Sequence, residues 1–389
     1  MSRLPVLSQW CDEIKQNLSS LSIPQATVLA MLSAGIFLGG TVSLPMIEAV
    51  VHQYVEQPIN TIHQRLREFY KDAEHKSGDR RVTLCVEDCF SSLLIWIINA
   101  WHGGVLPLAM DATTIDDRFT MLRVSVLFRG MAIPVAWHVL PGNQKGEWRE
   151  IWLEMLSRFK GVVAKGQAVL VLADRGLYAK WLFQKIVSLG WHPFLRINLG
   201  GFFRPDGSTV QALSNFIGSL GDCGGMRGVA FKAKERRLRC TLLTSSQEGM
   251  EPLLVLTDLD PDECNALWYR MRFWIEREFK TQKSASMQLQ RTRITDPTRL
   301  SRLILAISVS MLRAMSEGSQ SEDEGQTGET YNIAIAQRER PSGTRGRRTS
   351  LYNVGLSILR FAFMRDKRLR PILLRPEPLL RTVAYGNTG

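Results

Sequence analysis

The chain has 389 residues, 45% of them apolar, which excludes a disordered protein and allows two or three domains with at least one large core. Its 49 lysines and arginines outnumber its 37 aspartates and glutamates, for a net charge of +12. An excess of this size suits a polyanionic partner, either nucleic acid or an anionic membrane surface, and does not choose between them.

The first 80 residues are expected to form a helical accessory region. Within it, the stretch Ala26–Ile47 carries no charge over 22 residues, which is long enough to span a bilayer. However, Gly39-Gly40 followed by Ser43-Leu44-Pro45 is typical of one helix ending and another beginning. We therefore expect two buried helices joined by a tight turn, with a membrane helix as the alternative.

Residues 81–199 show the pattern of an α/β domain. A helix is expected first, then an antiparallel meander of three strands with Arg129-Gly130 as one of its turns. A helix, a short apolar strand and a further helix follow. The expected ranges are Thr83–Trp101, Val105–Ala112, Leu122–Phe128, Met131–Leu140, Glu147–Phe159 and Ala168–Ala173, with the last helix ending near Leu189. This order opens the ribonuclease-H-like fold, a mixed sheet flanked by helices.

The rest of the chain is expected to divide into four parts. Residues 200–259 have the glycine-rich turns of a mostly β insertion, and residues 260–317 resume the core as helices. Residues 318–337 open with a polar, acidic composition that predicts a flexible linker from Gly318 to about Thr330. Residues 338–389 form a basic C-terminal region, with 12 basic and 3 acidic residues.

Two aspartates follow apolar strands and are candidates for metal chemistry. Asp111 comes after the run that begins at Leu106, and Asp174 comes after Val169–Ala173. If these strands are neighbours, both carboxylates meet at one edge of the sheet. Phosphoryl transfer needs such carboxylates to fix two divalent ions about 4 Å apart. The alternative is that each is an ordinary turn-forming or helix-capping aspartate.

A third candidate lies in a spaced set of four polar residues, Tyr269-x2-Arg272-x3-Glu276-x6-Lys283. On a regular α-helix, at about 100° per residue, all four fall within an arc of about 60° beside an apolar face. Glu276 would then be a metal ligand, and the others would reach DNA phosphates. The alternative is an amphipathic helix on which Arg272 and Lys280 form surface ion pairs with Glu276.

These residues resemble the DDE transposases of bacterial insertion sequences, in particular the subgroup marked by Y-(2)-R-(3)-E-(6)-K. The signature matches residue for residue. The settings of the two aspartates, Ala109–Thr113 and Leu172–Tyr178, also look like that family, as does a β insertion between the second aspartate and the glutamate. The resemblance covers about Val105 to Lys283.

The resemblance implies an enzyme in which three carboxylates bind two Mg²⁺ or Mn²⁺ ions and three further side chains contact the transposon end. The implied metal ligands are Asp111, Asp174 and Glu276; the implied DNA contacts are Tyr269, Arg272 and Lys283. Hydrolysis frees a 3′-OH at each end, which attacks target DNA within a paired-end homodimeric complex. The N-terminal helices and the Arg345–Arg348 region would add end recognition and phosphate contacts.

Some members of the family pass through a DNA hairpin and stack a flipped base on an aromatic side chain of the insertion. The insertion here offers Phe202, Phe203, Phe216 and Phe231 but no tryptophan, so that role is not assigned to a residue.

Location and alternatives follow from the remaining features. The six cysteines form no CxxC pair and no Cys/His cluster, and no signal peptide opens the chain, so we expect reduced thiols in the bacterial cytoplasm, associated with the nucleoid and not with a membrane. Three alternatives remain open. They are another ribonuclease-H-like metal nuclease such as a resolvase, a transposase-derived DNA-binding protein without catalysis, and a membrane protein with a basic tail.

Overall fold

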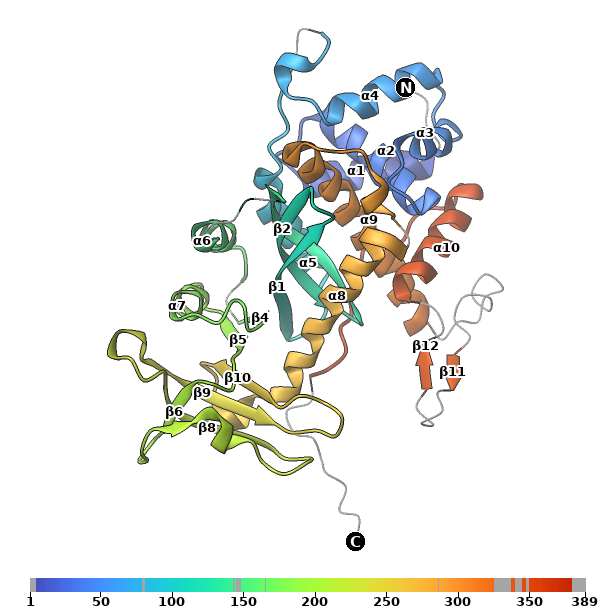
Figure 1. Ribbon diagram of the computed structural model, residues 1–389. Helices are drawn as coiled ribbons and strands as arrows, with labels where there is room; N and C mark the ends of the chain where they lie inside the picture. The colour runs from blue at the N-terminus through green and yellow to red at the C-terminus, as the bar shows by residue number, and fades with distance from the viewer. Residues whose placement is uncertain are drawn as a thin grey trace.

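A computed structural model describes residues 5–78, 81–142, 144, 148–164, 166–285, 287–324, 337–339, 345–347 and 350–379. Figure 1 shows a twisted central sheet with helices α6 and α7 beside it and α8 crossing it. The N-terminal helices pack at one end together with α9 and α10, and the β insertion lies at the other end.

The N-terminal region is helical, as predicted, with α1 (Pro5–Asn17), α2 (Ile23–Gly39), α3 (Leu44–His52), α4 (Ile59–Phe69) and the 3₁₀ turn η1 (Ala73–His75). Gly40, at φ 65°, ends α2, and Pro45 lies in the first turn of α3, so the predicted two helices with a tight turn are confirmed. Most of α2 is buried, as expected, whereas α3 buries only one face. Among the described residues no single helix is long and apolar enough to cross a membrane; α2 and α3 meet the requirement only as a pair bent by 98°.

The central sheet has the strand order β3-β2-β1-β4-β5 in its first half. The strands β1, β2 and β3 form the predicted antiparallel meander, and β4 and β5 run parallel to β1. Their bounds are β1 (Val105–Ile115), β2 (Phe119–Phe128), β3 (Met131–Pro141), β4 (Ala168–Ala173) and β5 (His192–Arg196), with η2 (Glu87–Cys89), α5 (Phe90–Ala100), α6 (Arg149–Ser157) and α7 (Lys180–Ser188) as the helices. This is a ribonuclease-H-like sheet, and it confirms the predicted fold class.

The insertion is antiparallel β structure that extends the same sheet. Its last strand, β10, pairs with β5, so the insertion and the core share one ten-stranded sheet. The bounds are β6 (Phe202–Pro205), β7 (Gln211–Ala212), β8 (Cys223–Ala230), β9 (Leu238–Ser245) and β10 (Leu253–Thr257), with the 3₁₀ turns η3 (Leu213–Phe216), η4 (Lys234–Arg236) and η5 (Pro261–Glu263). A rigid connection therefore links the insertion to the strands that carry the aspartates.

The expected regular α-helix over Tyr269–Lys283 is wrong in detail. The segment is three helices in series: the 3₁₀ helix η6 (Ala266–Arg272), α8 (Phe273–Lys280) and the π-helical turn η7 (Thr281–Ala285), followed by the 3₁₀ turn η8 (Leu289–Arg291). The helix type changes where the packing partners change: η6 packs on β4 and the insertion strands, whereas α8 packs on β1, β2 and β3. An even rotation of 100° per residue therefore does not describe it.

The expected flexible linker is also wrong at its start. The helix α9 (Pro297–Asp323) continues through Gly318, and α10 (Leu351–Met364) packs against it. A Cβ atom at Gly318 would lie 2.0 Å from the carbonyl oxygen of Leu351, and one at Gly355 would lie 1.8 Å from that of Ala314. Glycine therefore lets the two backbones touch, and this contact buries a polar helix end that composition alone assigns to solvent.

The basic C-terminal region is partly structural. Arg360 donates to the carbonyl oxygen of Leu38, and Arg370 donates to Glu317 and Glu324. Several positive charges of this region thus hold α10 and the chain after it against α2 and α9. The predicted linker residues 325–336 and the side chains of Arg345–Arg348 lie outside the described residues, apart from the backbone of a hairpin, β11 (Gln337–Glu339) and β12 (Arg345–Arg347).

Candidate active site

Asp111 and Asp174 lie side by side because β1 and β4 are parallel neighbours. Met110 is opposite Ala173 in the register, so each aspartate is the next residue on its own strand. Adjacent strands are about 4.8 Å apart, which brings the two backbones into the range of a shared site. The two strands then differ: β4 ends at Ala173, whereas β1 continues to Ile115 paired only with β2. Asp111 thus stands where the parallel pairing stops, and not at the end of its strand.

Glu276 reaches the same place from α8, and one guanidinium group joins all three acids. Arg272 Nη2 lies 2.7 Å from Oδ2 of Asp111 and 3.7 Å from Oδ2 of Asp174, and its Nη1 lies 2.7 Å from Oε1 of Glu276. The arginine side chain is only 7% exposed, whereas that of Glu276 is 52% exposed. The predicted surface pair is therefore a largely buried cation surrounded by three carboxylates.

The other two signature residues face the same side of the sheet. The hydroxyl group of Tyr269 donates to Oδ1 of Asp174 over 3.3 Å, and Nζ of Lys283 donates to the hydroxyl oxygen of Thr113, on β1, over 2.5 Å. Tyr269, Arg272 and Lys283 thus contact residues on β1 or just after β4, and Glu276 is joined to them through Arg272. The predicted common face assumed one regular α-helix, whereas three helix types in series carry these side chains.

A buried ion pair that the sequence reasoning missed fixes α8 to the sheet. Arg123 lies on β2 directly opposite Asp111 and donates to Glu278 and to Gln282; neither the Arg123 nor the Glu278 side chain is exposed. The hydroxyl group of Ser125 donates to the second Glu278 oxygen over 2.9 Å. Glu278 is two residues from Glu276, so this pair sets the height and rotation of the helix that presents the third carboxylate.

One signal in the sequence pointed to this pair. Arg123 is the one charged residue in a mostly apolar strand, and its neighbours Leu122 and Val124 face the opposite side. A charge in such a strand is expected either in solvent or opposite a buried acid. All ten residues of β2 are buried, which leaves only the second option.

The two aspartates have different electrostatic surroundings. Burial raises the pKa of Asp111, an effect that the Arg272 guanidinium opposes and the Asp174 carboxylate adds to. Burial acts in the same direction on Asp174, but the backbone N–H of Arg175 and the guanidinium groups of Arg272 and Arg196 outweigh it and lower its pKa. Asp111 is therefore the carboxylate that gains most from a further cation.

A cavity of about 380 Å³ opens on the insertion side of this cluster. Its lining includes Tyr269, Arg196, Met250 and Phe273, and the last two are 52% and 42% exposed. Arg196 and Arg175 both donate to Glu251, over 2.9 and 2.6 Å. Apolar and cationic groups thus lie together beside the tyrosine that contacts the Asp174 carboxylate.

The donor set suits a hard divalent cation, since Mg²⁺ and Mn²⁺ prefer carboxylate oxygens. In the described part of the chain, however, no three histidine, cysteine, aspartate or glutamate side chains are close enough together to hold a metal ion. Instead, the Arg272 guanidinium contacts the oxygens of both Asp111 and Asp174, over 2.7 and 3.7 Å. A divalent ion contacting both oxygens requires that the guanidinium leave this position.

Comparisons with known proteins add little. No family of known proteins and no curated protein sequence matches the chain. Among solved structures, it is similar to a piggyBac transposase synaptic complex with hairpin DNA, with a TM-score of 0.41 and 10% sequence identity over 95% of this chain and 80% of that chain. A similarity of this degree does not extend to individual side chains.

Proposed function

We propose that the chain is a DDE-type DNA transposase of the kind found in bacterial insertion sequences, which cleaves transposon ends and joins the freed 3′-OH to target DNA. One observation carries the proposal. Carboxylates from β1, from the end of β4 and from α8 converge on a single guanidinium at one edge of a ribonuclease-H-like sheet. A cluster of acids from three segments around one largely buried cation is typical of functional sites.

In this proposal Asp111, Asp174 and Glu276 bind two Mg²⁺ or Mn²⁺ ions, which when bound supply a polarised attacking oxygen and a stabilised leaving oxygen. The strand pairing holds the two aspartates rigidly. Glu276, the most exposed of the three, is positioned by α8, and the buried Arg123–Glu278 pair keeps that helix in place. The protein would thus bring the three carboxylates to one end of β1 and β4, where departure of Arg272 would leave their oxygens to the ions.

Arg272 has two roles in the proposal. Without metal it neutralises the carboxylates. With metal ions bound to the carboxylates, its guanidinium would be available to the DNA backbone, where the fork of N–H groups fits a phosphate. Tyr269 and Lys283 lie on either side along the same segment, and they would contact the transposon end together with Arg272. The partners are terminal inverted repeats and target DNA, bound by a homodimer in the bacterial cytoplasm.

The DNA that the protein cleaves distinguishes a transposase from a resolvase-like nuclease. With Mg²⁺, the full-length protein is expected to cleave a plasmid carrying the inverted repeats that flank its gene, and to leave the same plasmid with scrambled repeats intact. Joining of the 3′ ends to a second plasmid is expected in the same reaction. Cleavage of a four-way DNA junction irrespective of the repeats would instead identify a resolvase-like nuclease and overturn the proposal.

A further inference from the structure

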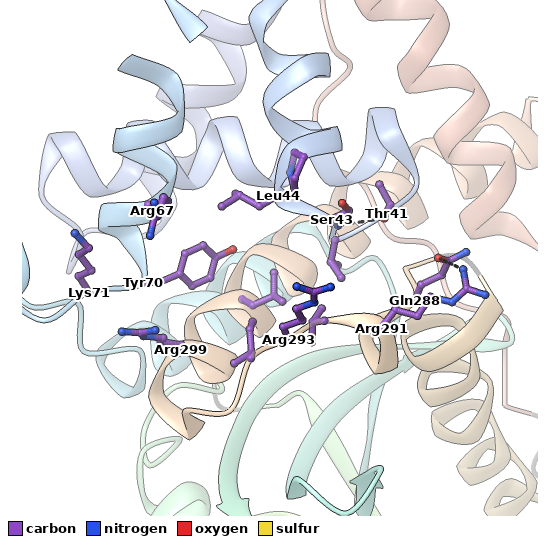
Figure 2. A pocket seen from close by; sticks show the side chains of 15 residues that line it. Thr41, Ser43, Leu44, Arg67, Tyr70, Lys71, Gln288, Arg291, Arg293 and Arg299 are labelled. Atoms are coloured by element: carbon purple, nitrogen blue, oxygen red, sulfur yellow. Dashed lines mark hydrogen bonds between the residues drawn. The ribbon is translucent and has the colours of Figure 1, made fainter. Parts of the chain in front are cut away.

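A second concave surface lies apart from the carboxylates, between the N-terminal helices and the segment that joins α8 to α9. It is a cavity of about 660 Å³. One wall is formed by the start of α3 and the end of α4, and the other by residues 288–294 and the first turns of α9 (Figure 2). We call it the basic groove.

The basic groove is lined by cations and by no acid. Its five cationic side chains are those of Arg67, Lys71, Arg291, Arg293 and Arg299. None of them forms an ion pair with a residue that the structure describes; Arg67 and Arg291 contact only the ring of His63 and the amide of Gln288. Figure 2 shows these side chains gathered around one opening.

The acids nearest along the chain do not line the groove and have other partners. Glu68, next to Arg67, accepts from the side-chain amide of Gln64 and the backbone N–H of Ser77. Asp72 pairs with Arg302, and Oδ1 of Asp296 accepts the backbone N–H of Arg299 at the start of α9. The positive charge of the groove is thus left without an internal counterion among the described residues. Five like charges that face one hollow repel one another unless an anion is bound there.

Two further arginines hold the walls of the groove. Arg118 donates to the carbonyl oxygens of Gln290, Thr292 and Ile294, over 2.8, 2.6 and 2.8 Å. These three carbonyl groups point toward Arg118. The side chains of Arg291 and Arg293, which lie between them in sequence, line the groove. On the other wall, the buried Arg302 donates to the carbonyl oxygen of Tyr70 over 2.8 Å. Hydrogen bonds to the backbone therefore hold both walls of the groove in place.

The same contacts tie the groove to the carboxylates. Arg118 follows the turn after β1, and β1 carries Asp111 four residues before its end at Ile115. Four steps along a strand cover roughly 13 Å. The strand that carries Asp111 thus leads, through Arg118, to the wall of the groove.

We propose that the basic groove binds the phosphate backbone of duplex DNA outside the site of cleavage. The inference rests on the proposed function, because it takes the carboxylates as the point of cleavage. A duplex fits better than an anionic membrane, since the charges line a hollow with fixed walls and do not rim a protruding apolar face. The groove thus adds affinity that does not depend on base sequence.

The test measures DNA binding by the full-length protein without divalent metal. The probe is a fluorescein-labelled 40-base-pair duplex, titrated at several salt concentrations. The variant Arg291→Gln/Arg293→Gln/Arg299→Gln is expected to bind more weakly, with the slope of log K against log salt reduced by roughly 2 to 3, about one for each phosphate that is no longer neutralised. The variant Arg67→Gln/Lys71→Gln, on the opposite wall, is expected to lose up to about 2 independently.

A matched control removes the same charge elsewhere. The variant Arg149→Gln/Lys160→Gln/Arg239→Gln carries three exposed substitutions outside the groove and is expected to keep the slope of the unchanged protein. Equal slopes for both groove variants and the unchanged protein would overturn the inference. So would groove-dependent binding to vesicles of phosphatidylserine and phosphatidylcholine without any effect on the duplex.

Cleavage in Mg²⁺, measured separately, distinguishes this inference from the proposed function. A protein that does not cleave DNA but whose groove variants bind the duplex with reduced slopes keeps the groove as a backbone site and loses the transposase proposal. A protein that cleaves the inverted repeats and whose groove variants bind normally keeps the transposase proposal and loses the groove as a backbone site.

Discussion

Replacement of Arg123 by methionine tests how the third carboxylate is positioned. Neither Arg123 nor Glu278 has an exposed side chain. The substitution leaves Glu278 with the hydroxyl group of Ser125 and the amide group of Gln282 as its partners. Loss of one member of a buried ion pair costs about 3 to 5 kcal/mol. With roughly 2 °C of Tm for each kcal/mol in a large domain, Tm is expected to fall by about 6 to 10 °C.

Calorimetry on a set of matched variants tests whether the buried Arg123–Glu278 pair causes this loss of Tm. The double variant Arg123→Met/Glu278→Leu removes both charges and is expected to recover most of the lost Tm, because no charge is left buried. Asp206→Asn breaks an exposed pair with Arg239 and is expected to leave Tm unchanged. A double variant as unstable as Arg123→Met alone would refute the assigned role of the pair. At 25 °C, Arg123→Met is also expected to slow Mg²⁺-dependent cleavage about 100-fold through misplacement of α8.

Three further outcomes follow from particular contacts. Gly355→Ala is expected to lower Tm by several degrees because its Cβ would lie 1.8 Å from a backbone oxygen of α9, whereas Gly104→Ala, with no atom within 4 Å, is the control that should leave Tm unchanged; equal Tm values would contradict the α9–α10 contact. A hydrogen bond to Asp258 raises the pKa of His192 above its ordinary 6.5, so this pair stabilises the fold below that pH and its contribution is lost as pH rises through the raised pKa. Urea unfolding between pH 5 and 9 should show this loss, and His192→Gln should abolish it; an unchanged profile in the variant would contradict the assignment. Tyr269→Phe removes a hydrogen bond to a carboxylate and is expected to lower metal-free stability in urea by about 1 kcal/mol without altering the fold by circular dichroism; an unchanged stability would count against that bond.

Much of the candidate site was predictable because it depends on local patterns. Apolar runs of strand length before Asp111 and Asp174 indicate buried strands, and a parallel pairing follows from the order of the elements. The spacing of the signature residues puts Arg272 and Glu276 on one segment, and in the structure Arg272 pairs with both aspartates and with Glu276. Each of these inferences needs only the residue itself and its neighbours along the chain.

The features that were missed depend on contacts between distant segments. Gly318 looks like part of a flexible linker until α10 is packed against it, since only the touching backbones explain the glycine. Arg123 and Glu278 are 155 residues apart, so nothing in either local sequence names the other as its partner. The change from 3₁₀ to α to π helix between Tyr269 and Lys283 likewise reflects what each turn packs against.

The central claim is that Asp111, Asp174 and Glu276 hold the metal ions that cleave DNA. The most direct measurement is the single-turnover rate of Mg²⁺-dependent cleavage of an inverted-repeat duplex by the unchanged protein, by Asp174→Asn and by Asp117→Asn, an exposed aspartate in the nearby turn. Loss of a metal ligand is expected to cost about 4 kcal/mol of transition-state stabilisation, so Asp174→Asn should be at least about 1,000-fold slower and Asp117→Asn unchanged. Equal rates for Asp174→Asn and the unchanged protein would contradict the claim.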